Sequence, residues 1–153
     1  MELILWRHAE AEEGVPGVSD MARQLTKRGL IQARTMAGWL KSQLPENALV
    51  LTSPAQRARQ TAMALCHDFD IVQEIGPGAS ANQILAAADW PYAQGAVVVV
   101  GHQPTLGETA CLLLSTMPSG LFFNKGAVWW ITCQKKKSTF VTELCTVKYS
   151  EMF

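Results

Sequence analysis

Four consecutive valines, Val97–Val100, constrain the fold of this chain more than any other feature of its sequence. A strand that is apolar at every position is buried on both faces, as in a parallel sheet with helices on each side. Strand and helix signals alternate along most of the chain, and this order produces such a sheet. The sequence therefore predicts an α/β fold with a mostly parallel sheet that is flanked by helices on both faces.

Apolar runs and apolar periodicity locate the individual elements. Strands are expected over residues 2–6, 48–52, 70–75 and 96–100, the third from the weakest signal, and shorter helices over residues 82–88 and 105–114. The longest helix is expected between an N-cap at Thr26 and a stop at Pro45. Its buried face should comprise Leu30, Ala33, Ala37, Leu40 and Leu44. Another helix should have Pro54 in its first turn and bury Ala58, Thr61, Ala62 and Leu65.

The C-terminal part of the chain shows a different pattern. Residues 127–133 and 139–148 are predicted to be extended and to pair antiparallel at the sheet edge, joined by a solvated turn at Lys135–Lys137. The chain of 153 residues has the length of one domain and contains no repeat, low-complexity tract or linker. We therefore expect a single domain over residues 1–153.

The composition disfavours several classes of partner. Lys and Arg together number 13, as do Asp and Glu, so the formal net charge is zero, whereas a nucleic-acid-binding domain usually carries a positive excess. The longest apolar runs, residues 96–100 and 127–131, are far shorter than the about 20 residues of a membrane span. The N-terminus lacks the features of a signal peptide, and the four cysteines, which form no CxxC pair, are expected to be buried, reduced thiols. These features predict a cytoplasmic protein that binds neither nucleic acid nor membranes. Its oligomeric state stays open, with a monomer favoured.

Three of the predicted strands run into side chains suited to a phosphoryl group. Arg7 and His8 follow the first strand, Arg57 follows the second, and His102 follows the fourth. In an open parallel sheet the carboxyl ends of the strands share one crevice, so these residues are expected to meet there. Arginine offers a planar fork of donors for phosphate oxygens, and histidine is a competent nucleophile near neutral pH. The third histidine, His67, is expected at the surface because it lies at the tail of a helix.

At these residues the sequence resembles the histidine phosphatase superfamily, whose fold is that of phosphoglycerate mutase. The likeness is carried by Arg-His-Ala-Glu at residues 7–10, by residues 53–61 and by Gly-His-Gln-Pro at residues 101–104. Residues 23–29 also match the segment that precedes the first long helix in this superfamily. Within the superfamily the chain is similar to the small SixA-type phosphohistidine phosphatases.

The resemblance implies a role for each matching residue. His8 would be the nucleophile that takes the phosphoryl group and forms a phosphohistidine intermediate. Arg7, Arg57 and His102 would bind the phosphoryl oxygens, His102 as a cation, and the backbone amide of Gln103 would add a donor. No metal or other cofactor is implied. The implied substrate is a phosphohistidine-bearing protein, such as a histidine phosphotransfer or other signalling protein.

The sequence lacks an obvious general acid. Mutases and phosphomonoesterases of this superfamily protonate an alkoxide leaving group with a carboxylic acid that lies between the second and third motifs. Of the carboxylates in that region, Glu74 is the best candidate, although no motif surrounds it. A phosphorylated imidazole leaves with little help, so the gap favours phosphohistidine as the substrate. Glu12, Glu13 and Asp20, in the loop after the nucleophile, are expected to be solvated.

Three other interpretations compete with a phosphohistidine phosphatase. The protein could be a small-molecule phosphomonoesterase that uses Glu74 or a carboxylate at the rim as its acid. It could instead be a non-catalytic module that binds phosphate or a phosphoprotein. A metal site formed by His8, His102 and Glu10 is disfavoured, because two flanking arginines would repel a cation.

Overall fold

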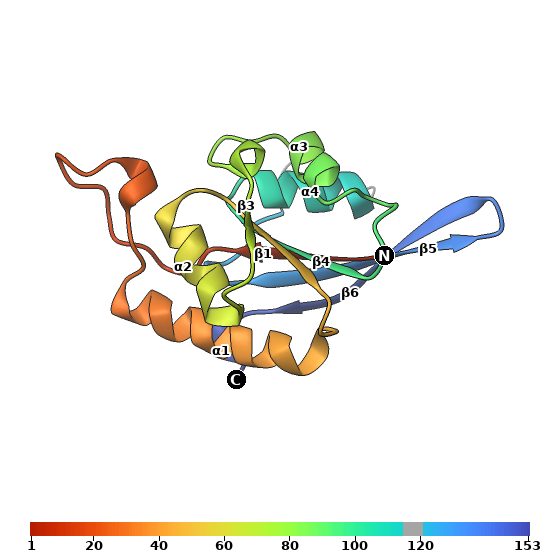
Figure 1. Ribbon diagram of the computed structural model, residues 1–153, viewed down its shortest axis with the longest axis horizontal. Helices are drawn as coiled ribbons and strands as arrows, with labels where there is room; N and C mark the ends of the chain where they lie inside the picture. Colours follow the sequence, from red (N-terminus) through yellow and green to blue (C-terminus); the bar gives the residue numbers. More distant parts are fainter. Residues whose placement is uncertain (115–120) are drawn as a thin grey trace.

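The computed structural model describes residues 1–114 and 121–153, and within them six strands form one mixed sheet (Figure 1). The strand order is β3-β2-β4-β1-β5-β6. The first four strands are parallel to one another, β5 pairs antiparallel with β1, and β6 pairs antiparallel with β5. The strands are β1 (Glu2–Arg7), β2 (Leu49–Thr52), β3 (Asp70–Ile71), β4 (Ala96–Gly101), β5 (Val128–Lys136) and β6 (Thr139–Lys148). The predicted α/β fold with an antiparallel C-terminal edge is confirmed.

Helices cover both faces of this sheet (Figure 1). Two of them, α1 (Lys27–Gln43) and α2 (Gln56–Leu65), lie on one face, and α3 (Ala81–Ala87) and α4 (Thr105–Leu114) lie on the other. Three short 3₁₀ helices complete the fold: η1 (Asp20–Ala22), η2 (Gln73–Ile75) and η3 (Ser150–Met152). Among the described helices, none is long and apolar enough to cross a membrane.

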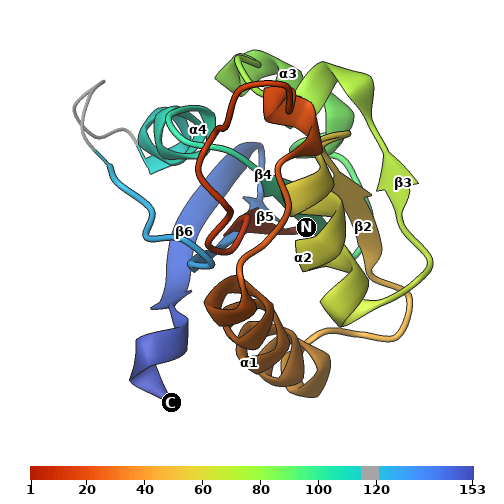
Figure 2. The same ribbon diagram turned by 90° about the vertical axis from the view of Figure 1, so that its left-hand side faces the viewer.

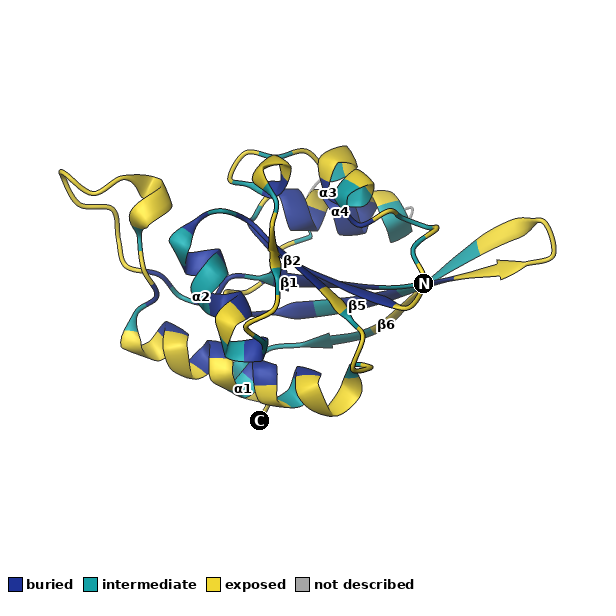
Figure 3. Cartoon of the chain, in the orientation of Figure 1, coloured by how far each residue is buried: buried dark blue, intermediate teal, exposed yellow. Residues whose placement is uncertain are grey.

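Strand β4 is the centre of the core, as its valines predict. It pairs with β1 on one side and β2 on the other, and all six of its residues are buried (Figure 3). Val98 and Val100 pack into the apolar cluster under α1 and α2. Val97 and Val99 pack into the cluster under α3 and α4. A strand with two apolar faces therefore holds the two helical layers together and fixes the position of its own carboxyl end.

Helix α1 begins where the sequence indicates, but its buried face is shifted. The Thr26 hydroxyl accepts a hydrogen bond from the backbone N–H of Gly29 at 2.9 Å, which confirms the predicted N-cap. Leu30 is 36% exposed, contrary to prediction, because at 100° per residue it lies at the edge of the buried stripe. The buried residues of the helix are Gly29, Gln32, Ala33, Met36, Ala37 and Leu40.

Three element boundaries differ from prediction. Pro54 precedes the N-cap residue Ala55, so it shapes the turn before α2 and is not part of the helix. The third strand is only two residues long, because the chain turns into η2 after a last hydrogen bond from Val72 N–H to the carbonyl of Thr52. In the C-terminal hairpin, β5 continues to Lys136, so only the end of the predicted turn Lys135–Lys137 lies outside the strands.

The cysteines are free thiols, but they are not all buried. Cys111 and Cys133 are buried, Cys66 is half-buried and Cys145 is exposed. Cys145 lies on β6, the edge strand of the sheet, whose central residues are largely exposed, and this explains why the expectation of four buried thiols is wrong.

Candidate active site

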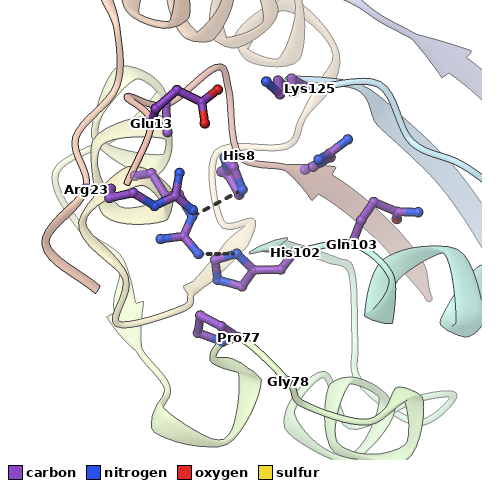
Figure 4. Close-up of a pocket in the computed structure, with 11 residues that line it drawn as sticks. His8, Glu13, Arg23, Pro77, Gly78, His102, Gln103 and Lys125 are labelled. Atoms are coloured by element: carbon purple, nitrogen blue, oxygen red, sulfur yellow. Dashed lines mark hydrogen bonds between the residues drawn. The ribbon is translucent and has the colours of Figure 1, made fainter. Parts of the chain in front are cut away.

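The carboxyl ends of β1, β2 and β4 meet at one edge of the sheet, as the sequence predicts. Backbone hydrogen bonds tie them together: His8 N–H donates to Gly101 O at 3.1 Å, and Ser53 N–H donates to Val100 O at 3.0 Å. A pocket of about 270 Å³ opens at this edge (Figure 4). Its lining residues are Arg7, His8, Ala11, Glu13, Arg23, Arg57, Pro77, Gly78, His102, Gln103 and Lys125.

The His8 ring is held in one orientation by hydrogen bonds at both of its nitrogens. Nδ1 lies 2.7 Å from the carbonyl oxygen of Ala9, which can only accept, so Nδ1 carries the proton. Nε2 is left with its lone pair, and this nitrogen accepts a hydrogen bond from Arg57 Nε at 3.3 Å. The unprotonated nitrogen of His8 therefore faces Arg57 inside the pocket, and this nitrogen can attack a phosphoryl group once Arg57 donates to the phosphoryl oxygens instead.

Arg57 projects from the first turn of α2 and connects the two histidines. Its Nη2 atom lies 3.5 Å from Nδ1 of His102, and the centroids of the two imidazole rings are 5.2 Å apart (Figure 4). Because the guanidinium donates, Nδ1 of His102 is the acceptor and Nε2 carries the proton. That proton is donated to the hydroxyl of Ser53, since Nε2 and Oγ are 2.7 Å apart. Ser53, the residue that follows β2, therefore fixes the His102 tautomer.

Both histidines are neutral near pH 7. Burial lowers the pKa of His8 to about 4, with the charges of Arg57, Arg7 and Arg23 adding to this effect against the opposing hydrogen bond to the Ala9 carbonyl. A neutral imidazole is the form that can attack phosphorus.

The expectation that His102 binds a phosphoryl group as a cation stays a prediction, because in the pocket by itself the residue is neutral. Burial, together with the nearby His8 and Arg57, lowers the pKa of this residue to about 3. His102 therefore donates from Nε2 only to Ser53 and accepts at Nδ1.

Arg7 lies at the end of β1 and lines the same pocket. Its Nη1 donates to the carbonyl of Phe123 at 2.6 Å, and the guanidinium lies 5.3 Å from the centre of the Phe122 ring. Within residues 1–114 and 121–153, its buried Nε–H has no hydrogen-bond partner, which leaves a donor available to an oxygen atom. The side chain of Gln103 is engaged by the Leu121 carbonyl, to which it donates at 3.1 Å, while the predicted role of its backbone amide stays a prediction.

The loop that carries His8 is braced from both sides. The Thr61 hydroxyl on α2 accepts from Ala9 N–H at 3.1 Å and donates to the Arg57 carbonyl at 2.8 Å. On the other side, Gly126 N–H donates to the His8 carbonyl at 3.1 Å. One hydroxyl group therefore connects the backbone next to His8 with the backbone of Arg57.

The loop between β1 and α1 contributes more to the site than its sequence suggests (Figure 2). Asp20 forms an ion pair with Arg57 at 3.1 Å, so the expectation that the acidic residues of this loop are solvated is wrong for Asp20. Glu13 is exposed, as expected, and also lines the pocket together with Arg23. Lys125, which precedes β5, also lines the pocket. Neither Glu13 nor Lys125 belongs to a local pattern, so sequence reasoning had no signal with which to find them.

Other candidate residues lie away from the pocket. Glu74 is exposed on η2 and does not line the pocket. The residues that line the pocket include a different carboxylate, Glu13. Glu10 accepts from the Thr26 hydroxyl at 2.8 Å and also lies outside the pocket, which separates it from the two histidines of the postulated metal site. His67 is exposed, as predicted.

Comparisons with known proteins agree with the geometry. A family model of the histidine phosphatase superfamily (branch 1) matches residues 3–78, which include Arg7, His8 and Arg57. Phosphohistidine phosphatase SixA of Escherichia coli K12 is 31% identical over 115 residues, which are 70% of this chain and 70% of that protein.

Solved structures show the same fold. The structure of the protein histidine phosphatase SixA complexed with tungstate is similar with a TM-score of 0.82 and 25% identity, covering 99% of both chains. Phosphoserine phosphatase of Entamoeba histolytica, at 19% identity and a TM-score of 0.65, covers 85% of this chain and 89% of its own. The second likeness concerns the fold alone, whereas the sequence relationship to SixA decides the family. The chain therefore belongs to the histidine phosphatase superfamily.

Proposed function

We propose that the protein is a metal-independent phosphohistidine phosphatase that dephosphorylates a phosphorylated signalling or phosphotransfer protein. The observation that carries the proposal is the state of His8, whose Nδ1 proton is donated to the Ala9 carbonyl and whose unprotonated Nε2 faces the guanidinium of Arg57. The sequence relationship to phosphohistidine phosphatase SixA supports the same substrate class.

In the first step, Nε2 of His8 attacks the phosphorus atom and the bond from phosphorus to the substrate imidazole breaks. The substrate ring departs as a neutral imidazole when its other nitrogen already carries a proton. His8 then holds the phosphoryl group on Nε2 and keeps its proton on Nδ1, where the Ala9 carbonyl accepts it. Arg7 and Arg57 stabilise the charge on the transferred oxygens. His102 adds a donor once the negative charge of the phosphoryl group favours protonation of its Nδ1.

In the second step, water attacks phosphorus and the bond from phosphorus to His8 Nε2 breaks. The electron pair returns to Nε2, so His8 is again neutral, and the product leaves as dihydrogen phosphate. The charges balance, because the phosphorylated imidazolium carries one net negative charge and so does the product. Neither step requires the enzyme to supply an acid to an alkoxide.

Two hollows beside the pocket support a protein substrate. One, of about 480 Å³, shares Glu13 and Arg23 with the pocket and contains the exposed apolar side chains of Val15 and Val18. Each hollow is larger than the pocket itself, so a free phosphorylated metabolite would leave this space unused, whereas a polypeptide around a phosphohistidine would fill it.

The second hollow, of about 450 Å³, lies on the other side and shares Arg7 and Lys125 with the pocket. It includes the exposed ring of Phe122, together with Tyr149. Aromatic and arginine side chains are those that protein interfaces favour.

Trapping of the intermediate tests the proposal. After brief incubation with a ³²P-labelled phosphohistidine peptide, the denatured wild-type protein should carry label that is stable to base and lost in acid. His8→Ala should carry no label, and His67→Ala, which alters the exposed histidine, should carry the wild-type amount. Near-normal turnover by His8→Ala would show that the mechanism is wrong.

A small-molecule phosphomonoesterase remains a second candidate because Glu13 lines the pocket and could protonate an alkoxide. A comparison of phosphohistidine peptide with sugar and nucleotide phosphates separates the two functions. A non-catalytic binding module would bind phosphate through Arg57 and turn over none of these substrates.

A further inference from the structure

Asp20 holds the guanidinium of Arg57 from the outside of the pocket. Arg57 Nη1 donates to the Asp20 carbonyl oxygen at 2.8 Å, and Nη2 donates to Oδ2 at 3.1 Å. Arg57 is only 4% exposed, whereas the side chain of Asp20 is 58% exposed. A buried cation is therefore bound by an anion that reaches it from an exposed loop.

The contact with Asp20 decides which edge of Arg57 faces the histidines. Asp20 occupies the edge formed by Nη1 and Nη2, while the edge formed by Nε and Nη2 faces His8 and His102 at 3.3 and 3.5 Å. A guanidinium is planar and rigid, so fixing one edge fixes the other. Without the Asp20 carboxylate, Nη2 would keep only its 3.5 Å contact with His102, and the single hydrogen bond from Nη1 to the backbone carbonyl of residue 20 would allow the guanidinium to rotate out of line.

Asp20 also brings a second arginine to the pocket. Its Oδ1 accepts from Arg23 Nε at 3.0 Å and lies 2.9 Å from Arg23 Nη2. Burial raises the pKa of the Asp20 carboxyl, but the hydrogen bond from Arg23 and the charge of Arg57 outweigh this and leave the pKa below its usual value. One charged carboxylate thus offsets the repulsion between two guanidinium groups that line the same pocket.

We propose that Asp20 is a positioning residue that acts through Arg57, holding its Nε and Nη2 donors toward the phosphoryl group on His8. The proposal rests on the proposed function for its kinetic consequence. Loss of the carboxylate should lower kcat, because the donors are no longer aligned in the transition state. It should not weaken phosphate binding, because the pocket becomes more positive when a negative charge is removed.

The kinetic test uses Asp20→Asn, with phosphoramidate as substrate and inorganic phosphate as competitive inhibitor. We expect kcat to fall about tenfold to a hundredfold in Asp20→Asn, while the inhibition constant of phosphate stays unchanged or decreases. Asp20→Glu should recover part of the loss. Glu12→Gln, which removes a carboxylate from the same loop, is the matched control and should behave as the wild type. A kcat within about twofold of wild type in Asp20→Asn would overturn the proposal.

A double-mutant cycle distinguishes positioning from general support of the loop. In an Arg57→Ala background, Asp20→Asn should cause no further loss of kcat, because its effect runs through the missing guanidinium. If the fold-losses in kcat of the two single variants multiplied in the double variant, Asp20 would act independently of Arg57, which would contradict the proposal.

NMR of the Arg57 Nε–H group supplies a readout that needs no turnover. This proton should exchange slowly with solvent in the wild type and in Glu12→Gln, and faster in Asp20→Asn. If the wild type failed to hydrolyse any phosphoramidate, the proposed function would be rejected. The exchange rate of the Arg57 Nε proton would still test whether Asp20 positions the guanidinium. Equal exchange in wild type and Asp20→Asn would reject that role.

Discussion

The imidazole of His102 and the hydroxyl of Ser53 meet across the ends of β4 and β2, with 2.7 Å between Nε2 and Oγ. Ser53 Oγ also accepts from the backbone N–H of Ala55 at 3.2 Å, so the hydroxyl links the start of α2 to the histidine. Both residues are buried, and neither hydrogen bond can be replaced by bulk water. The orientation of His102 in the pocket therefore depends on the residue that follows the neighbouring strand β2.

Ser53→Ala should impair both activity and folding. Without the hydroxyl, His102 loses the acceptor of its Nε2 proton and can turn away from the phosphoryl group, so kcat/KM for a phosphohistidine peptide should fall about tenfold to a hundredfold. The unfolding free energy should fall by about 1–2 kcal/mol, because a buried donor is left unpaired. Steady-state kinetics and urea unfolding measure the two effects. Ser42→Ala, which removes an exposed hydroxyl of α1, is the control, and an equal effect of both changes would contradict the assigned role.

The stability of the protein should fall as the pH falls below about 6.5. The pKa of His8 is about 4 and that of His102 about 3 in the folded state, below the usual value of 6.5, so the unfolded chain binds more protons in this range. Each histidine should add a slope of up to about 1.4 kcal/mol per pH unit between pH 6.5 and its folded pKa. Urea unfolding at pH 5, 6 and 7 should show a flatter slope in His8→Gln than in the wild type. A slope unchanged by His8→Gln, or one flattened equally by His67→Gln, would be inconsistent with this account.

Two glycines of α1 should respond in opposite ways to alanine. A Cβ atom on Gly29 would lie 1.9 Å from the carbonyl oxygen of Glu10, next to the catalytic loop, so Gly29→Ala should destabilise the fold by about 2–3 kcal/mol. Gly38 has no atom within 4 Å of its would-be Cβ, so Gly38→Ala should stabilise the helix by about 0.5–1 kcal/mol. Chemical denaturation of both variants provides the measurement. A stabilised Gly29→Ala would mean that the helix and the loop are not in this close contact.

Glu13, rather than Glu74, should affect any hydrolysis of alkyl phosphate esters. Glu13 lines the pocket and can protonate an alkoxide, so Glu13→Gln should lower ester turnover about a hundredfold while changing the turnover of phosphohistidine peptide much less. Glu74→Gln should leave both unchanged, because this residue lies outside the pocket. Parallel assays with phosphoserine and phosphohistidine peptides make the comparison. Loss of ester turnover in Glu74→Gln would instead assign the acid to η2.

Local sequence patterns were sufficient to predict most elements of the fold. The valines of β4 are apolar on both faces, and this property alone indicates a strand between two helical layers, as observed. The third strand was predicted too long, because an edge strand with one neighbour carries little apolar signal and can end wherever the chain turns. Leu30 was predicted to be buried but lies at the edge of the buried face of α1, because periodicity indicates the direction of a helix face more accurately than its width.

By itself, the sequence determined that Arg7, His8, Arg57 and His102 come together. Each lies at the end of a parallel strand, just after one, or in the first turn of the helix that follows one. The carboxyl ends of such strands share one edge of the sheet. Only the tertiary structure decided the surroundings that set their chemistry. Asp20, Glu13 and Lys125 lie on loops without periodicity, so only the folded chain places their charges beside the pocket. The neutral state of both histidines likewise arises from burial and from neighbouring cations, which are properties of the packed site and not of any local pattern.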